Sequence, residues 1–250
     1  MGDTVLLSEQ DKVLTITINR PERRNALDFA TYNALTGAFK AATGRNDLHA
    51  IILQGAQQYF TAGNDLRDFQ QKPEDESPGL RFLKALAATD IPVIAAVEGA
   101  AIGIGVTLLM HCDFVIAASN TTFRIPFVPL GLCPEGSSSV LLAKYVGIRK
   151  ANEWLYSGKP FSANEALDCG FINTVTEPGE SLATAMEIAN NMAKQSLLSL
   201  KTTKSLLKRT LTPLITETFN IEREAFIACL NSPEAQAAFK QFFTKEKSIS

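Results

Sequence analysis

Three glycine-containing segments hold the residues whose types and spacing could do chemistry. They are Phe60-Thr61-Ala62-Gly63-Asn64-Asp65-Leu66, then Glu98-Gly99-Ala100-Ala101-Ile102-Gly103-Ile104-Gly105-Val106, and last Leu132-Cys133-Pro134-Glu135-Gly136-Ser137-Ser138-Ser139. The first is a small-small-Gly turn that enters a helix, so its outward backbone N–H groups could bind an oxyanion. An ordinary helix start capped by Asn64 is the alternative interpretation.

The second segment joins a strand to a helix. Gly103 and Gly105 fit a G-x-G pattern, but the dinucleotide fingerprint needs a third glycine at position 108, which is Leu108. A nucleotide-binding fold is therefore excluded. Two interpretations stay open for the segment: a functional turn with close backbone approach, or a packing turn between buried elements.

The third segment places Glu135 between Pro134 and Gly136, just before an apolar helix. One interpretation is a first-turn acid favoured by the helix dipole. The other is a partly desolvated general base. The chain has only two histidines, His49 and His111, so a carboxylate is the expected acid–base group at neutral pH.

Composition limits the class of protein. The chain has 250 residues, 46% hydrophobic and 20% charged, which is an ordinary globular balance for one large domain or a domain with a helical extension. A net charge of -2 leaves no bulk basicity for a nucleic-acid backbone. The four cysteines form no C-x-x-C pair, so neither a zinc knuckle nor a disulfide framework is expected, and no metal site is predicted.

No targeting or membrane segment is evident. Met1–Lys12 carries acids and no hydrophobic region typical of a signal peptide, and apolar runs such as Ile91–Val97 are too short to span a bilayer. We therefore expect a cytoplasmic protein with reduced thiols and no membrane span.

The pattern of apolar residues, which alternates in 13–18 and is continuous in runs such as 50–53 and 93–97, predicts the elements that must position these segments. In the first half, buried strands are predicted at 13–18, 50–53, 93–97 and 114–118, with helices after Asp28, at Leu80–Ala88 and at Gly103–His111. This order of strands and helices predicts an α/β fold.

The second half turns mainly helical. Helices are predicted at 137–145, 149–156 and 163–169, with one strand at 171–176. After Pro178 the chain is expected to be entirely helical, with Pro213 and Pro233 starting new helices.

The three segments, in this order and at these separations, resemble the crotonase family of acyl-CoA enzymes. Further matches are Asn19-Arg20-Pro21 through Asn25-Ala26-Leu27, Asp90-Ile91-Pro92-Val93-Ile94-Ala95 and Cys112-Asp113. The resemblance covers about residues 5–176. It implies a crotonase-like spiral of ββα units in residues 1–197, followed by a C-terminal helical trimerisation region in 198–250.

The resemblance also implies a site. The carbonyl of a coenzyme A thioester would lie between the backbone N–H groups of Asn64 and Ile104, an oxyanion hole for the enolate. Coenzyme A is then part of the substrate, and no other cofactor is implied; a homotrimer or dimer of trimers is the expected assembly. The residues expected to bind the substrate are Arg24, Ala26, Ala62, Gly63, Asn64, Asp65, Leu66 and Phe127.

Departures from the family pattern narrow the expected reaction. Family hydratases place two catalytic glutamates where this chain has Thr107 and Phe127, and Phe127 would make that wall apolar. The segments around Pro126-Phe127 and Pro134-Glu135-Gly136 instead resemble the enoyl-CoA delta isomerases of peroxisomal type. In that branch a single Glu shuttles the proton, and Glu135 is its counterpart.

We therefore expect an isomerase that shifts a 3-enoyl-CoA double bond to the 2-trans position in acyl-CoA catabolism. The nearest alternative is an enoyl-CoA hydratase or thioester hydrolase that uses Glu135 or another acid. A further alternative is a non-catalytic acyl-CoA-binding scaffold.

Overall fold

The core of the molecule is a six-stranded sheet with the strand order β1-β2-β3-β4-β6-β9. A computed structural model of the chain describes residues 3–67 and 76–247. Strands β1 and β2 pair in antiparallel fashion, and the remaining neighbours are parallel. The six strands are β1 Val5–Gln10, β2 Val13–Ile18, β3 Ala50–Gly55, β4 Val93–Val97, β6 Phe114–Ala118 and β9 Thr174–Thr176.

A second, three-stranded sheet is built from short strands in the order β5-β7-β8. They are β5 Ala100–Ile102, β7 Thr122–Arg124 and β8 Phe161–Ser162. The chain passes from β4 to β5 and then into a helix, and it repeats this path from β6 to β7. Because β4 pairs with β6 and β5 pairs with β7 in parallel, successive units stack as a spiral. The predicted α/β spiral of ββα units is confirmed.

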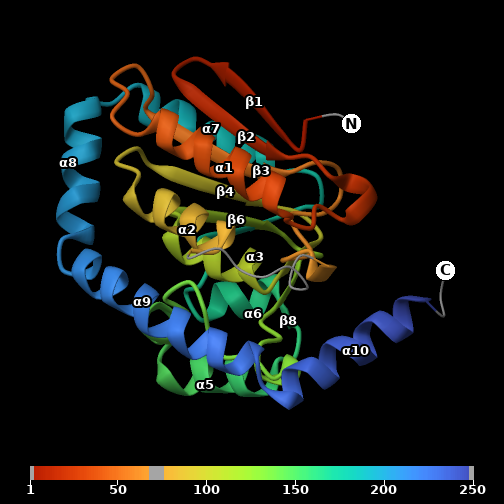
Figure 1. The fold of residues 1–250 in the computed structure, drawn as a ribbon. Helices are drawn as coiled ribbons and strands as arrows, with labels where there is room; N and C mark the ends of the chain where they lie inside the picture. Colours follow the sequence, from red (N-terminus) through yellow and green to blue (C-terminus); the bar gives the residue numbers. More distant parts are fainter. Residues whose placement is uncertain (1–2, 68–75, 248–250) are drawn as a thin grey trace.

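Helices cover both faces of the large sheet. Helices α1 (Phe29–Ala42) and α2 (Pro78–Ala88) pack together over one face, and α7 (Ser181–Ala193) packs on β3 and β4 from the other (Figure 1). Parallel strands buried on both faces consist of continuous apolar runs, and every residue of β4 is buried. Asp28 caps α1 as expected, accepting from the Thr31 N–H at 2.8 Å.

The remaining helices lie after the strand pairs and at the C-terminal side. Figure 1 shows α8 and α9 running along one side and beneath the body, with α10 projecting away from it. Among the described residues, no helix is long and apolar enough to cross a membrane. These elements are η1 Pro21–Arg23, α3 Ile104–Thr107, η3 Leu108–His111, η4 Val128–Leu130, α4 Ser138–Val146, α5 Ile148–Ser157, α6 Ala163–Asp168, α8 Leu197–Lys208, α9 Leu211–Leu230 and α10 Pro233–Lys247.

Several predicted bounds differ from those of the structure. The helix predicted at Gly103–His111 is split into α3 and the 3₁₀ helix η3, and the strand predicted at 171–176 is reduced to β9. Pro233 starts α10 as predicted, whereas Pro213 lies two residues inside α9. The boundary expected between residues 197 and 198 falls at the start of α8, and its status as a domain boundary stays a prediction.

Candidate active site

Two glycine turns lie side by side at the centre of the site. An isolated bridge joins Thr61 to Ala101, and the Ile102 N–H donates to the Thr61 carbonyl at 3.1 Å. Gly63, with φ of +87°, lies so close to this neighbour that a Cβ would be 2.6 Å from the Ile102 carbonyl oxygen. A Cβ on Gly105 would be 2.6 Å from Cγ2 of Thr61. Only glycine allows this approach of the two backbones.

These turns leave two backbone N–H groups without an acceptor in the described part of the chain. They belong to Asn64, which follows Gly63, and to Ile104, the first residue of α3. The first N–H groups of a helix have no intrahelical partner. Gly103, which precedes Ile104, adopts φ +56° and ψ −116°, a conformation restricted to glycine. The two donors are those that the sequence predicts for the oxyanion hole.

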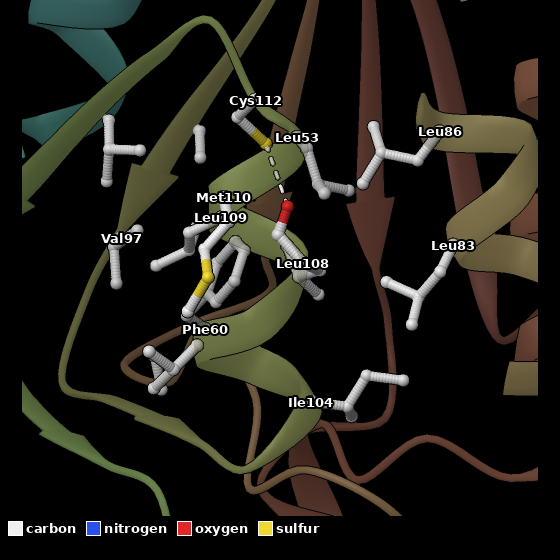
Figure 2. Packing of buried hydrophobic residues seen from close by; sticks show 14 of the residues in the cluster. Leu53, Phe60, Leu83, Leu86, Val97, Ile104, Leu108, Leu109, Met110 and Cys112 are labelled. Carbon is white, nitrogen blue, oxygen red and sulfur yellow. Dashed lines mark hydrogen bonds between the residues drawn. The ribbon is translucent and has the colours of Figure 1, made fainter. Parts of the chain in front are cut away.

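The positions of both donors are held from behind. Figure 2 shows buried residues, among them Phe60, Leu83 and Leu108, packed around the helical turns that begin at Ile104. On the other side, the Tyr32 hydroxyl of α1 donates to Oδ1 of Asn64. This contact orients the Asn64 side chain, and no motif in the sequence predicts it.

The loop after β2 runs beside the first glycine turn. The Ala62 N–H donates to the Arg24 carbonyl at 3.0 Å, and the Leu27 N–H donates to that of Gly63 at 2.8 Å. The Asp65 N–H returns to the Leu27 carbonyl at 2.9 Å. The structure therefore brings the predicted binding residues of 24–27 and 62–65 together along one seam.

The side chains of this seam differ in exposure. The Arg24 guanidinium is exposed and lies 5.8 Å from the ring centroid of Tyr59. Ala26 and Ala62 are half-buried, and Leu66 packs against the main core. None of these four predicted residues lines the cavity described next.

Glu135 faces a cavity that also reaches Asn64, Asp65 and Ile104. Four predicted site residues are thus gathered in one place from three separate segments. Phe127 is 4% exposed and belongs to the main core, and its Cε1 lies 3.9 Å from where a Gly103 Cβ would be. Phe127 therefore supports the turn from behind, and the structure does not place it on the cavity wall. The apolar lining residues are Leu27, Phe29, Pro78, Leu80, Ile104, Phe219, Phe226, Ile227 and Leu230.

Glu135 is held by one side-chain hydrogen bond. Thr107 of α3 donates its hydroxyl to Oε1 at 2.9 Å. Gly136, with φ of +73°, lets the two segments meet, since its Cβ would be 3.0 Å from Cβ of Thr107. Burial raises the pKa of Glu135 to about 7, the Thr107 hydrogen bond opposes this, and the negative charge of Glu222 adds to it. At neutral pH both protonation states are therefore populated.

Glu222 of α9 is a third carboxylate that lines the cavity, after Asp65 and Glu135, and it is not among the site residues predicted from the sequence. Its Oε2 accepts from the Ser137 N–H at 2.6 Å and its Oε1 from the Ser139 N–H at 2.9 Å. Burial raises its pKa, and these hydrogen bonds oppose the rise. A usable signal exists in the sequence, because Phe219 and Phe226 lie three and four residues away and place Glu222 on an apolar helix face.

His111 supports the Glu135 segment from the protein interior. Its Nε2 donates to the Gly136 carbonyl at 2.9 Å, and its ring stacks on Phe219 with centroids 5.5 Å apart. Burial lowers the pKa of His111 to about 4, so the ring is neutral at the pH where Glu135 titrates. Among the described residues, no group of three His, Cys, Asp or Glu side chains could hold a metal ion.

Comparison with known proteins identifies the family. A family model described as enoyl-CoA hydratase/isomerase matches residues 8–249. The chain belongs to this family. The predicted crotonase resemblance is therefore confirmed over nearly the whole chain, including the helical region beyond residue 176 that carried no motif.

Relatives of this enoyl-CoA hydratase/isomerase family member span nearly its full length. A short-chain-enoyl-CoA hydratase of Clostridium acetobutylicum is 32% identical, covering 98% of this chain and 96% of the relative. A 2,3-dehydroadipyl-CoA hydratase of Escherichia coli is 30% identical, covering 96% of each. A crystal structure of an enoyl-CoA hydratase/isomerase from Pseudoalteromonas atlantica T6c superposes with a TM-score of 0.93 at 36% identity over 97% of each chain.

The comparisons support the predicted family and fold but not the predicted type of reaction within the family. Membership of an acyl-CoA enzyme family is shown, and so is the fold. The specific likeness to delta isomerases of peroxisomal type is not, because the relatives above are named hydratases. The family model itself covers both reactions.

Proposed function

We propose that this enzyme moves the double bond of a 3-enoyl-CoA to the 2-trans position. Glu135 is the proton shuttle, and the N–H groups of Asn64 and Ile104 stabilise the dienolate oxygen. The substrate class follows from family membership. The choice of isomerisation over hydration rests on the residues that line this cavity.

The observation that carries the proposal is the state of the three acids that line the cavity. Asp65 forms ion pairs with Arg67 at 2.5 Å and Arg20 at 3.5 Å, and both oxygens of Glu222 accept backbone N–H bonds. Glu135 is the remaining acid of the described lining, and it is bonded to a hydroxyl alone.

Thr107 supports a role for Glu135 as the single catalytic carboxylate. The family resemblance places a catalytic glutamate of hydratases at this position, where it would help to hold the attacking water. Here a hydroxyl stands in its place and is donated to Glu135. One carboxylate is sufficient for moving a proton between two carbons, whereas addition of water is expected to need two.

The proposed reaction conserves atoms and charge. The Glu135 carboxylate takes the proton from C2 of the thioester, and the electron pair of the C–H bond moves into the dienolate, whose oxygen accepts the two N–H bonds. The protonated Glu135 then returns the proton to C4, and the double bond is left between C2 and C3. A pKa of about 7 suits a group that serves as base and then as acid. The apolar lining limits competing proton exchange with water.

Hydration of a 2-enoyl-CoA is the second candidate, and the names of the relatives favour it over isomerisation. In that reaction Glu135 would activate the water. Thr107, which stands where the resemblance places a catalytic glutamate of hydratases, would offer only its hydroxyl. Thioester hydrolysis and binding without turnover are further alternatives that the family membership leaves open.

The test is to incubate the protein separately with 3-enoyl-CoA and 2-enoyl-CoA and to analyse products by mass spectrometry and absorbance. Migration of the double bond without a gain of water supports the proposal. A 3-hydroxyacyl product supports hydratase, free coenzyme A supports hydrolase, and binding alone supports the scaffold.

Glu135→Gln tests the residue that carries the proton. We expect its kcat for isomerisation to fall about 10²- to 10⁴-fold, the usual contribution of a general acid–base. Glu187→Gln, an exposed position on α7, is the matched control and should turn over as wild type. Full isomerase turnover in Glu135→Gln would exclude Glu135 as the base.

We also propose self-association through the C-terminal helices as a homotrimer or dimer of trimers. Leu198, Leu206, Leu207 and Ile221 on α8 and α9 are 77%, 62%, 73% and 59% exposed, more apolar surface than a free helical face commonly shows. Light scattering measures the mass directly. The cytoplasmic location stays a prediction.

A further inference from the structure

Glu222 occupies an unusual position for an acid. It lies on α9, 85 residues after Ser137, and its side chain is 6% exposed. Each carboxylate oxygen accepts one backbone N–H bond, from Ser137 at 2.6 Å and from Ser139 at 2.9 Å. Both donors belong to the start of α4, directly after the segment that carries Glu135.

This contact joins α9, which lines one side of the cavity, to the segment that carries Glu135. Phe219 and Phe226, on the same face of α9 as Glu222, line the cavity together with Glu135. A second bond in the same place runs from the Ser137 hydroxyl to the Ile215 carbonyl at 3.1 Å. Ser137 itself, the residue before α4, adopts a left-handed conformation with φ of +60°.

We propose that Glu222 is a positioning residue of the active site: it anchors the segment that carries Glu135 and places a negative charge in the cavity that the Glu135 carboxylate faces. Glu222 makes no step of the reaction, because its two oxygens are already engaged. The effect on turnover rests on the proposed function, whereas the coupling of the two carboxylates does not.

The anion of Glu222 is stabilised by the same contacts that place it. Burial raises the pKa of Glu222, whereas two charge-assisted N–H bonds and the positive end of α4 favour its ionised form. When Glu135 also loses its proton, two carboxylates share one low-dielectric cavity, and their repulsion makes Glu135 retain its proton to higher pH. The raised pKa of Glu135 has this charge among its causes, after burial.

Other ionisable groups around Glu135 come from the elements packed against the cavity. Tyr32 of α1 and Arg223 of α9 line it, and Asp65 is ion-paired with arginines. His111 of η3 contacts Glu135 only through the Gly136 carbonyl and is neutral. Glu222 is therefore the negative group expected to influence Glu135 most.

The experiment is an NMR titration of the full-length protein with ¹³C-labelled glutamate side chains. The Glu135 signal is assigned by its loss in Glu135→Gln. In Glu222→Gln, which removes the charge at nearly constant shape, we expect the Glu135 midpoint to fall by about one pH unit. Glu224→Gln, an exposed position on the same helix, is the matched control and should leave the midpoint unchanged.

An unshifted Glu135 midpoint in folded Glu222→Gln, or an equal shift in the Glu224→Gln control, would overturn the proposal. If Glu222→Gln does not fold, the wild-type protein supplies the test. The amide signals of Ser137 and Ser139 should then show a transition at the Glu135 midpoint that disappears in Glu135→Gln. If the amide signals of Ser137 and Ser139 show no transition at the Glu135 midpoint, the proposal is also overturned.

A kinetic measurement separates this inference from the proposed function. In Glu222→Gln the acidic limb of the isomerase pH profile should move down by the same one unit. A merely structural role would lower kcat without moving the limb. If the enzyme proves not to be an isomerase, the NMR coupling of Glu135 to Glu222 still stands or falls on its own result.

Discussion

The protonation of Glu135 is set by burial first, and then by two neighbours, Thr107 and Glu222, that act in opposite directions. The Thr107 hydroxyl bonds to the ionised carboxylate and favours it, whereas burial and the charge of Glu222 favour the protonated form. A base with a pKa of about 7 is active in its ionised form, so turnover should rise as the pH passes upward through 7.

Removal of the Thr107 hydroxyl tests this balance. Thr107→Val takes away the hydrogen bond that lowers the pKa of Glu135, so the acidic limb of kcat/KM should move up by about one pH unit. Turnover at pH 7 should fall roughly fivefold, while the plateau at high pH is less affected. Thr107→Ser keeps the hydroxyl and serves as the control. The same limb in Thr107→Val and wild type would contradict the role given to the hydroxyl.

At this scale the sequence predicts residues on local motifs and misses those that meet only through the fold. Glu135, Asn64 and Ile104 were predicted from motif positions, and the structure brings them to one cavity. The Tyr32 contact with Asn64 and the Glu222 contact with α4 join residues 32 and 85 positions apart. A local sequence pattern cannot predict which residue, distant in the chain, such a side chain will contact. Phe127 was predicted on the cavity wall, but its ring points into the core.

The two glycine turns act as one element because they are in close contact. A side chain on Gly63 or on Gly105 would collide with the opposite turn. Gly63 meets the carbonyl of Ile102, and Gly105 meets the side chain of Thr61. The spacing of the two N–H donors therefore depends on backbone contact and not on the side chains of Asn64 and Ile104.

Gly63→Ala should separate the turns. A Cβ there combines φ of +87° with a 2.6 Å approach to a carbonyl oxygen, so we expect a loss of about 1–3 kcal/mol in the free energy of unfolding. Because the Asn64 N–H moves with it, kcat should fall roughly 10²-fold.

Gly37→Ala is the matched control for this prediction. Gly37 is exposed on α1, and a Cβ there meets nothing within 4 Å. Alanine should raise stability by up to about 1 kcal/mol and leave kcat unchanged. Urea unfolding and steady-state kinetics measure both effects, and unchanged kcat in Gly63→Ala would contradict the coupling of the turns.

Secondary structure can be predicted where burial leaves an apolar pattern in the sequence, either alternating or continuous. The strands of the large sheet that are covered by helices, such as β2 and β4, carry apolar patterns and were found. Strand β1 was missed because five of its six residues are exposed, so nothing in their polarity marks a face. The short strands of the second sheet, three residues or fewer, are too brief for a period to show.

Over the whole molecule, two buried groups make stability depend on pH in opposite senses. His111 has a folded pKa of about 4, below its ordinary 6.5, so its contribution is present above pH 6.5 and is lost as the pH falls toward 4. Glu135 has a folded pKa of about 7, above its ordinary 4.5. Its contribution is present below pH 4.5 and is lost as the pH rises through 7.

His111→Gln isolates the first of these. Glutamine can still donate to the Gly136 carbonyl but does not titrate. Between pH 6.5 and 4, wild type should lose about 3 kcal/mol more unfolding free energy than His111→Gln. Urea unfolding at several pH values measures the difference in slope. Parallel curves for the two proteins would show that His111 does not enter the folded core in its neutral form.

The 85 residues between Ser137 and Glu222 also bear on how the protein is made. During synthesis the two glycine turns and the segment of Glu135 leave the ribosome well before α9, the helix that supplies both the cavity roof and the anchor. A nascent chain that stops before Leu211 would lack Phe219, Glu222 and the other α9 residues that line the cavity. The cavity is therefore expected to close only after α9 has been synthesised and has docked against the start of α4.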